Sequence, residues 1–554
     1  MSEPDACHTP PACAKRPGLA PITAIGLVIA LCGISCARFT PPERSPDELV
    51  VPDEFALYDT SGAVPERWWK VFESDELNHL IERALSDNLS LRQMYSRLIQ
   101  AEMVAIQAGA ARVPSLDYSG DISTGRRRVD TGKHADQLTT LNPKISAWNR
   151  LNAAGSIPPA DVLDALDQAG AALKAIDTLT AGQPSSHSTF TTRSYRFGLG
   201  SSFEVDLWGR VRSQHEAALS DVEATREDLY GAMLSLSALV AREWLFAVTQ
   251  RQTIALVERQ LELNKTTLGL IELRHRKGMA TALDVYQQRQ IVAGTESLLP
   301  PLESALQTTL HELAVLLGQE PRAELGVTQD GLPKAGPLPA PGLPADLLAR
   351  RPDIRAAGLR LRSADWRVSV ARADRLPALR LTGAASYGAD DWDLVFNNWA
   401  ATLAAGVTGP IFDAGRRKAE IERTRAVVDE RLAAYQERVL VAAREVETAL
   451  YEEVKQGEYI AALERELDAA RDAHNQALLR YRKGSNDYLP VVSALSQLQV
   501  VERRLVQAEL ARLDLRVQLC VALGGSWMAP EHEAIRAREQ AAAPETAAPL
   551  PRNG

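Results

Sequence analysis

Long stretches of the chain carry apolar or small residues at alternating steps of four and three, a spacing typical of helices that pack along a seam. After Gly415 these positions are Val428, Leu432, Tyr435, Val439, Ala442, Val446 and Ala449. The pattern runs without a proline over residues 210–276 and again over residues 416–482. At a rise of about 1.5 Å per residue, each segment predicts a helix roughly 100 Å long.

Shorter helical patterns accompany each long one. After an Arg-x-Arg-Lys-Gly motif the pattern resumes at about Asp284 or Val491, and it ends near Gly318 or Gly524. Two further helices, over about residues 77–113 and 346–376, precede the strand segments described below. Each of these four helices is about half as long as the long ones, so two of them stacked end to end match one long helix.

The two sets of helices are copies of one unit. The motif Arg274–Gly278 returns as Arg480–Gly484, 206 positions later, and this displacement holds without a gap from Gly209 to Gly318. An upstream block repeats at a displacement of 263, which places 57 additional residues between Leu116 and Gly209. A repeat of this length predicts a tandem duplication that sets the architecture.

Four segments alternate apolar and polar residues with a period of two, which predicts half-exposed strands. They cover residues 116–123, 195–207, 379–387 and about 399–412. Strands of about ten residues with one apolar face suit a transmembrane barrel, but four strands cannot close one. Several chains would therefore share one barrel, because open edges leave backbone groups unpaired in lipid. A soluble sandwich, or hairpins packed on the helices, is the alternative.

Composition narrows the functional classes. The net charge is −9, with 62 Lys and Arg against 71 Asp and Glu, which does not favour nucleic-acid binding. The sequence contains no HExxH, GxSxG, P-loop or GxGxxG motif, and His311-Glu312 lacks the second His of a zinc motif. We therefore predict a protein that is not an enzyme and that has no metal site and no cofactor.

The N-terminus predicts export from the cytoplasm. An apolar segment over residues 22–34 follows Lys15-Arg16 and is too short to span a bilayer, so it reads as a secretory signal. The end of this segment, Gly33 to Cys36, resembles a lipobox, which predicts lipidation of Cys36, as with palmitate. Ordinary signal-peptidase cleavage nearby is the alternative. Ala37 resembles an outer-membrane sorting residue.

Over about residues 65–526 the chain resembles the outer-membrane factor family of TolC- and OprM-type export channels. The resemblance rests on these residues: Trp69, Phe72, Asp75, Leu80-Ile81, Ala84-Leu85 and Asn88; the run from Leu343 to Arg355; Asp206 to Arg210; Gly409 to Arg416; and Arg480 to Gly484 with Tyr488-Leu489. The run that contains Arg351-Pro352-Asp353 is similar to the lipoprotein branch that partners resistance-nodulation-division (RND) pumps.

The resemblance implies an α+β membrane protein with a trimeric TolC-like fold. Four strands per chain would enter one shared 12-stranded outer-membrane barrel above a long periplasmic coiled-coil tunnel. The implied partners are a periplasmic adaptor, an inner-membrane RND transporter and outer-membrane lipid, and the implied function is a passive duct that expels small molecules. A duct for type I protein secretion, or a periplasmic coiled-coil scaffold lipoprotein without a channel, remains an alternative.

By the same resemblance the two Arg-x-Arg-Lys-Gly turns form the tunnel tip. The predicted adaptor-docking residues are Arg276, Lys277, Gly278, Met279, Lys483, Gly484 and Ser485. The candidates for contacts that close the aperture are Asp284, Tyr481, Arg482 and Asp487. The alternative is that these residues only cap turns, and both roles are compatible for the two glycines. Family members often place acidic residues where this chain has Pro490 and Ser493.

The predicted domain order follows from these assignments. Residues 1–36 form the signal peptide, 37–76 an N-terminal equatorial segment, 77–318 the first repeat, 319–343 a Pro- and Gly-rich equatorial linker, 344–526 the second repeat and 527–554 a disordered tail. A long exterior loop over about 129–188 lies inside the first repeat. This loop is an insertion that the fold tolerates or, alternatively, an element that recognises a partner or plugs the channel.

Overall fold

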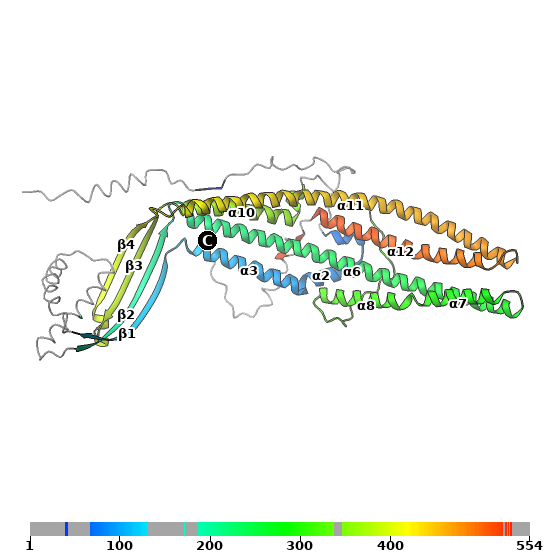
Figure 1. Ribbon diagram of the computed structural model, residues 1–554, viewed down its shortest axis with the longest axis horizontal. Helices are drawn as coiled ribbons and strands as arrows, with labels where there is room; N and C mark the ends of the chain where they lie inside the picture. Colours follow the sequence, from blue (N-terminus) through cyan, green and yellow to red (C-terminus); the bar gives the residue numbers. More distant parts are fainter. Residues whose placement is uncertain are drawn as a thin grey trace, which may run out of the picture. The chain divides into compact units, whose positions relative to one another are not determined.

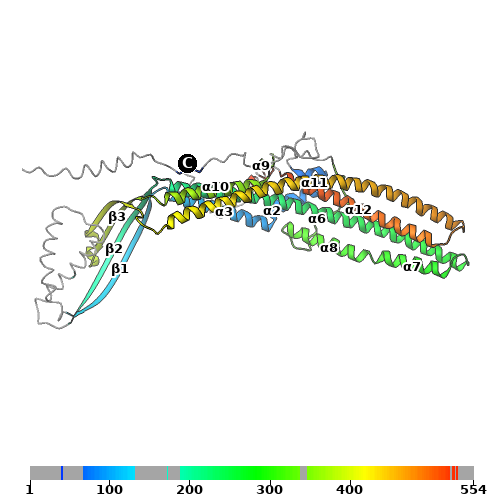
Figure 2. The ribbon, with the colours of Figure 1, turned by 45° about the horizontal axis from the view of Figure 1, so that its top comes forward.

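The computed structural model describes residues 39–41, 67–130, 187–336 and 346–524, and the separate residues 171, 527, 528, 530, 532 and 533. Contacts divide the chain into unit 1, residues 1–38, 110–211 and 374–413, and unit 2, residues 39–109, 212–373 and 414–554. Unit 1 holds the strands and unit 2 most of the helices (Figures 1 and 2). The predicted signal and Cys36 lie outside the described residues, as do residues 131–170 and 172–186 of the predicted loop.

Unit 1 contains one antiparallel sheet with the order β1-β2-β3-β4. The strands are β1 (Ser115–Asp130), β2 (His187–Val205), β3 (Ala378–Ala389) and β4 (Trp399–Thr408), and the short helix η3 (Trp392–Asn397) joins β3 to β4. All four predicted strands are confirmed. β4 ends earlier than predicted because Gly409-Pro410 follows it and proline cannot donate a ladder hydrogen bond. β1 and β2 are longer than predicted because polar residues continue the pairing.

The sheet has one apolar and one polar face. Directly opposite residues share a face, and one row across the sheet consists of Tyr118, Leu199, Ala385 and Ala401. On this face Tyr118 is 89% exposed and Leu403 is 87% exposed. Large apolar side chains exposed together on one face are typical of a surface that lies in lipid or against a partner. Among the described residues, no strand pairs with the outer edge of β1 or of β4, so the sheet is open on both sides.

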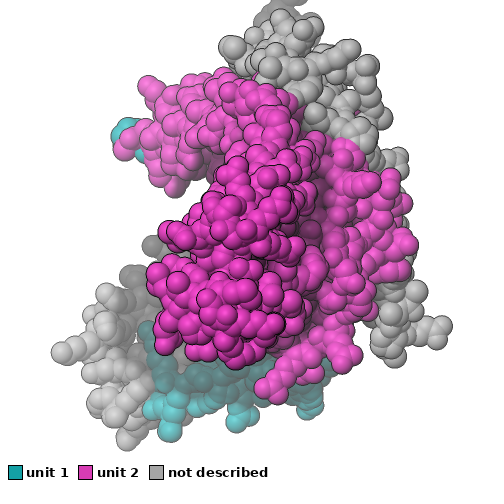
Figure 3. Space-filling view, turned by 90° about the vertical axis from the view of Figure 1, so that its right-hand side faces the viewer, with its two compact units in different colours: residues 1–38, 110–211, 374–413 teal, residues 39–109, 212–373, 414–554 magenta. Residues whose placement is uncertain are grey.

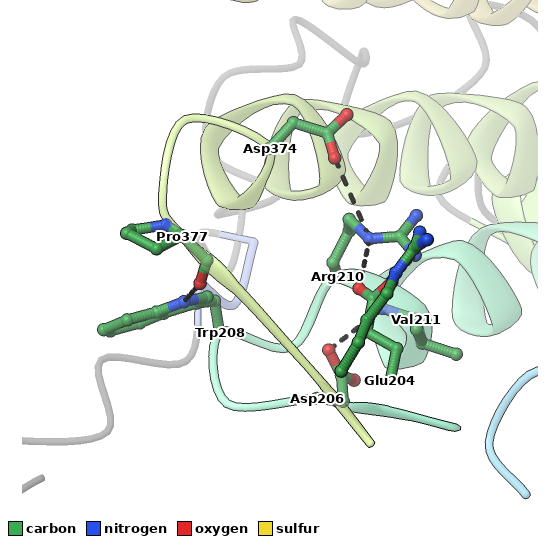
Figure 4. A network of polar contacts seen from close by, with 8 residues as sticks. Glu204, Asp206, Trp208, Arg210, Val211, Asp374 and Pro377 are labelled. Carbon is green, nitrogen blue, oxygen red and sulfur yellow. Dashed lines mark hydrogen bonds and ion pairs between the residues drawn. The ribbon is translucent and has the colours of Figure 1, made fainter. Parts of the chain in front are cut away.

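Polar contacts within unit 1 hold the end of the sheet that leads into the helices (Figure 4). The Trp208 indole donates a hydrogen bond to the Pro377 carbonyl oxygen at 2.8 Å. Arg210 forms a bidentate ion pair with Glu204, at 2.8 and 2.9 Å, and lies 3.8 Å from Asp374. These contacts join the end of β2 and the residues after it to the segment that precedes β3.

The same joint caps the first long helix. α6 (Arg210–Arg276) begins after Gly209, whose φ of +76° lies in the left-handed region. The Asp206 carboxylate accepts a hydrogen bond from the Val211 N–H at 3.1 Å, which satisfies an otherwise free donor of the first helical turn. The motif Asp206 to Arg210 is therefore a structural joint between strand and helix.

Unit 2 is built on two long helices, α6 and α11 (Arg416–Arg482), each with 67 residues and therefore roughly 100 Å long. This confirms both long helices and their bounds. One window of α6 is long and apolar enough to cross a membrane, but 56% of it is buried inside the structure. A window that is mostly buried in this way is typical of a core helix in a bundle.

The helix predicted over residues 77–113 is broken into α2 (Asp75–Asp87) and α3 (Leu89–Ala110). Asn88 causes the break, because its backbone is extended and its side-chain oxygen accepts the Leu91 N–H at 2.9 Å. Its amide also donates to the Leu316 carbonyl at 2.8 Å. The prediction of one continuous helix is wrong here, since Asn88 serves as a cap inside the pattern.

The equivalent helix of the second repeat, predicted over 346–376, is broken into α9 (Asp346–Arg350) and α10 (Pro352–Ala373). Pro352 lacks an N–H and disfavours a helical backbone at Arg351. The break puts Arg351 in a buried position, where it pairs with Asp353 at 2.9 Å and with Glu445 at 2.7 Å. This part of the family signature is therefore a corner at which a buried arginine pairs with two partly exposed carboxylates.

The two return helices also differ. The first consists of α7 (Ala282–Glu296) and α8 (Leu299–Leu316), whereas the second is one helix, α12 (Leu489–Leu523). Pro300 and Pro301 lie in the first turn of α8, where a missing N–H is tolerated but continuation from α7 is not. The prediction of one unbroken first return helix is wrong for this reason.

The largest core cluster of unit 2 lies where the short helix η2 (Trp68–Phe72), α2, α3 and the middle of α6 meet. Trp68, Trp69 and Trp244 are at most 1% exposed. The Trp68 indole donates to the Ser237 hydroxyl at 3.2 Å, and the Trp244 indole donates to Glu76 at 2.7 Å. The cluster buries large aromatic rings without leaving these two donors unpaired.

Part of the predicted disordered tail, 527–554, belongs to this core. Trp527 and Met528 are 4% and 2% exposed, and the Trp527 ring stands edge-on to Trp69 with centroids 4.8 Å apart. His532 is also buried and packs against Tyr95, with centroids 5.4 Å apart. The prediction of disorder is wrong for these residues, because burial of large side chains offsets the entropy of ordering the chain.

Within the predicted linker 319–343, the described residues reach Gly336 and are tied to long helices. Arg516 on α12 is 1% exposed, forms an ion pair with Glu453 on α11 and donates to the Gly336 carbonyl at 2.9 Å. Arg251 on α6 donates to the Val327 carbonyl at 2.7 Å. Arginines of two helices, α6 and α12, therefore hold the linker in place, and Glu453 of α11 pairs with one of them.

Candidate functional site at the two helical turns

The first turn, between α6 and α7, is closed by its backbone. The Gly278 N–H donates to the His275 carbonyl and the Met279 N–H to the Arg274 carbonyl, both at 2.8 Å. This pair of bonds is the Schellman motif, which requires a left-handed residue. Gly278 supplies it with a φ of +73°.

The second turn, between α11 and α12, has the same backbone. The Gly484 N–H donates to the Tyr481 carbonyl and the Ser485 N–H to the Arg480 carbonyl, both at 3.0 Å. Gly484 also has a φ of +73°. The sequence repeat therefore corresponds to a repeated turn geometry, and basic residues at both helix ends favour the negative end of the helix dipole.

The predicted docking residues form exposed surface at this end of unit 2, which Figure 3 faces. Met279 is 55% exposed although it is apolar. The other six predicted residues are exposed as well: Arg276, Lys277, Gly278, Lys483, Gly484 and Ser485. The two turns thus offer backbone and small or apolar side chains to a partner, with basic side chains beside them.

Behind the turns a small core joins the two hairpins. Ile271 and Val285 from the first hairpin pack with Tyr481, Tyr488 and Val491 from the second. The Tyr481 and Tyr488 rings have centroids 5.0 Å apart. Tyr488 is only 1% exposed, although it lies four residues from an exposed turn glycine. The contacts show that the second turn reaches into the first hairpin.

The cation of this cluster is Arg274. Its guanidinium carbon lies 4.7 Å from the centre of the Tyr481 ring, which is a cation–π contact between the two hairpins. Burial raises the pKa of Tyr488 and, against the opposing charge of Arg274, that of Tyr481. The negative charge of Asp284 adds to both shifts. Both hydroxyls therefore remain protonated at physiological pH and can act as hydrogen-bond donors.

A buried polar chain continues from Tyr488 away from the turns. The Tyr488 hydroxyl donates to Gln288 Oε1 at 2.7 Å, and Gln288 Nε2 donates to the Asn264 carbonyl at 2.8 Å. Asn264 in turn donates to the Thr295 hydroxyl at 2.9 Å and accepts from Gln499 at 3.0 Å. Two of these bonds, Tyr488 to Gln288 and Gln499 to Asn264, join the second hairpin to the first and must break if the hairpins separate. The other two hold α6 to α7 within the first hairpin.

The structure brings together only two of the four aperture candidates. Tyr481 is buried and lies near Asp284, whereas Arg482 and Asp487 are exposed. The Asp284 carboxylate accepts the Thr281 N–H at 2.9 Å, and Thr281 Oγ1 accepts the Asp284 N–H at 3.2 Å, which is a capping box at the start of α7. Asp284 therefore has a capping role within the chain, and its role at the aperture stays a prediction.

Sequence reasoning missed Arg274, Gln288 and Tyr488 as parts of this site. The repeat itself contained a signal, because Tyr488 stands where the first copy has Ala282. An aromatic residue in only one copy of a duplicated turn indicates a contact that the other copy does not make. Among the residues that the structure describes, no group of His, Cys, Asp or Glu is placed to hold a metal ion.

Comparison with known proteins identifies the family. Residues 80–319 and 343–525 match the family described as outer membrane efflux protein. The pyoverdine export outer membrane protein OpmQ of Pseudomonas putida is 31% identical over 507 residues, which cover 91% of this chain and 97% of OpmQ. The solvent efflux pump outer membrane protein SrpC of Pseudomonas putida is 31% identical over 336 residues, covering 60% of this chain and 71% of SrpC.

A solved structure of the outer-membrane channel OprN superposes with a TM-score of 0.72 at 28% identity, covering 88% of this chain and 99% of OprN. These matches confirm the resemblance drawn from the motifs and the predicted α+β fold of trimeric TolC-like channels. They also confirm the outer membrane as the location and an efflux channel as the class of function, whereas nothing in them indicates catalysis. The chain belongs to the outer membrane efflux protein family.

Proposed function

We propose that three copies of this chain join their sheets into one 12-stranded barrel and their helices into one periplasmic tunnel. The observation that carries the proposal is the open sheet with one apolar face. Because neighbouring strands run in opposite directions, β4 of one copy meets β1 of the next in antiparallel orientation. Barrel closure would pair both open edges and place the apolar face in lipid.

The assembled protein would serve as a passive duct for small molecules. Its relatives are named for pyoverdine export and for solvent efflux, so we infer cargo of that size class rather than folded proteins. The inner-membrane RND transporter would supply the energy and the choice of substrate. The chain itself would contribute a path across the outer membrane and the periplasm, without catalysis or cofactor.

The exposed turns would dock a periplasmic adaptor. Gly278 and Gly484 expose backbone, and Met279 adds an apolar side chain beside basic residues. A coiled-coil hairpin of an adaptor could cover these groups and bury Met279. The four aperture candidates, Asp284, Tyr481, Arg482 and Asp487, would then respond to docking. A lipid on Cys36 would anchor each copy to the inner leaflet of the outer membrane.

Disulfide cross-linking tests the barrel. Ser119→Cys on β1 is combined in turn with Ala400→Cys, Thr402→Cys or Ala404→Cys on β4, so that one pair matches the register across the interface. The native Cys520 does not interfere, because it is 1% exposed and burial raises the pKa of its thiol to about 12. We expect one combination to give a covalent trimer on a non-reducing gel.

The matched control combines Ser119→Cys with Ala384→Cys on β3, from which β1 is separated by β2 in the same sheet. This pair should give no cross-link between chains. If no β1–β4 combination links the chains while the protein remains in the outer membrane, the shared barrel is wrong. Co-purification of an adaptor and an RND transporter would test the remainder of the proposal.

A further inference from the structure

The β1–β2 hairpin extends past the rest of the sheet. The last β2–β3 pair is Tyr195 with Ala389, whereas β1–β2 pairing continues to Asp130 with His187. This two-stranded ribbon is at the end of the strands opposite to the helices, because β1 follows α3 and β2 precedes α6. In the proposed function this end faces the outer leaflet and the exterior.

The apolar face of the sheet ends here in aromatic rings. Trp392 from η3 packs edge-on against Tyr195 and Phe197, with ring centroids 5.5 and 6.0 Å apart. Ile122 is directly opposite Tyr195 and lies on the same face. Aromatic rings at the end of an apolar band mark the boundary between hydrocarbon and headgroups in membrane barrels.

Two arginines follow directly on that face. On this face the next pair of opposite residues is Thr124 with Arg193, and the pair after it is Arg126 with Thr191. Arg126 and Arg193 are therefore diagonal neighbours, about 7–8 Å apart at their Cα atoms. All four side chains are exposed, in a chain whose net charge is −9. Arg126 begins the run Arg126-Arg127-Arg128, so the two arginines belong to a basic segment of an otherwise acidic chain.

We propose that Arg126 and Arg193 bind a phosphate group of a lipid in the outer leaflet. Two guanidinium groups on one face can converge on one phosphate, and their planar donors suit its oxygens. The hydroxyls of Thr124 and Thr191 are additional donors on the same face. The adjacent Trp392 cluster would contact the lipid's apolar part, so the site selects a membrane lipid rather than free phosphate. This inference rests on the proposed function, which places the apolar face in lipid.

The chain supplies a matched control for charge. Arg127 is next to Arg126, is also exposed and lies on the opposite face of the ribbon, where it pairs in register with Phe190. A general attraction of the basic ribbon to anionic lipid would be weakened equally by loss of either arginine. A site on one face would be weakened only by loss of Arg126 or Arg193.

The experiment uses the full-length protein purified in detergent, with lipid A that carries both phosphates, dephosphorylated lipid A and inorganic phosphate as probes. Native mass spectrometry counts bound lipid, and titration gives its affinity. We expect the wild-type protein to bind lipid A. The Arg126→Ala/Arg193→Ala double variant should bind it with at least tenfold lower affinity. The Arg127→Ala variant should bind as the wild type does, and the dephosphorylated probe should bind at least tenfold more weakly.

Equal weakening in Arg127→Ala, or equal binding of the dephosphorylated lipid, would overturn the site. Displacement of lipid A by millimolar inorganic phosphate would show that the site takes free phosphate and not a lipid. Heat-modifiable migration on gels shows that each variant still assembles. Conductance in planar bilayers separates the two proposals: a conducting wild type without lipid binding refutes only this site, whereas a protein that neither assembles nor conducts refutes the duct.

Discussion

The two turns of the duplicated hairpin share one backbone conformation, but their side chains make different contacts. Both are Schellman motifs with a glycine at φ +73°. After the first turn, Thr281 and Asp284 cap their own helix. After the second, the start of α12 has no side-chain cap, and Tyr488 is buried against the first hairpin. One copy therefore stabilises itself, and the other holds the two copies together.

This difference suggests how a duplicated element can become asymmetric without a change of fold. The backbone motif depends on one glycine per turn, so the neighbouring positions are free to diverge. In the repeat, Ala282 corresponds to Tyr488 and Asp284 corresponds to Pro490. Tip mobility should therefore depend on the second turn more than on the first.

The largest effect should come from Tyr488→Ala. It removes a side chain that is 1% exposed, together with its hydrogen bond to Gln288, and should cost about 3 kcal/mol in the tip cluster. We expect faster hydrogen exchange in both hairpins near the turns and a higher single-channel conductance. Tyr286→Ala is the control, because Tyr286 is 66% exposed on α7. Equal exchange and conductance in both variants would show that Tyr488 does not hold the hairpins.

Replacement of the two turn glycines should give the next largest effect, and the effect should be equal at the two turns. Gly278→Ala and Gly484→Ala each force a left-handed alanine, at a cost of about 1–2 kcal/mol, with no steric clash to add. Hydrogen exchange at the end of the preceding helix should rise equally in both. Gly269→Ala, inside α6 and also without close neighbours, should not raise exchange and serves as the control. Unequal effects of the two turn variants would mean that the turns differ in backbone as well.

Thr281→Ala should have a smaller and strictly local effect. The capping box at the start of α7 would lose one of its two bonds, which costs about 1 kcal/mol. Exchange should rise in the first turn of α7 and remain unchanged in α12. The equivalent variant in the second copy, Asp487→Ala, should leave the start of α12 as it was, because no side chain caps that helix. Loosening of α12 by Asp487→Ala would contradict the comparison.

Periodicity and the repeat were sufficient to predict the long helices, the strands and the turns. The bounds of α6 and α11 agree with the predicted ones because no proline or cap interrupts their patterns. The breaks at Asn88 and at Pro300 were not predicted, since both residues occur inside a helical period. A cap or a proline pair changes the backbone locally, whereas hydrophobic spacing averages over several turns.

The site was predictable only in part. Exposed turn residues follow from the position of the glycines, so the exposure of the predicted docking residues could be predicted, whereas their docking role stays a prediction. The contacts between hairpins were not, because they join residues about 200 positions apart, such as Gln288 and Tyr488. Asp284 was a candidate for the aperture by family resemblance, and the structure gives its carboxylate a capping partner, Thr281, three residues away. Sequence spacing reveals local partners more readily than distant ones.

The smallest effect should be a dependence of tip stability on alkaline pH. Burial raises the pKa of Tyr481 and Tyr488 above the value of about 10 for an unfolded tyrosine. Their contribution to stability is therefore complete below pH 10 and is lost as the pH rises through the folded values, since the unfolded chain releases these protons first. Arg274 opposes the shift of Tyr481, and Asp284 adds to both shifts. Tip opening, followed by limited proteolysis at the turns, should accelerate above pH 10.

Tyr488→Phe separates this titration from general alkaline unfolding. The variant lacks the ionisable group, so its proteolysis should rise less steeply above pH 10, although loss of the bond to Gln288 costs about 1 kcal/mol at lower pH. Tyr286→Phe, at an exposed position on the same tip, should keep the wild-type pH dependence. If Tyr488→Phe also kept the wild-type slope, the buried tyrosine would not be the group whose ionisation loosens the second turn, and the asymmetry of the two turns would rest on packing alone.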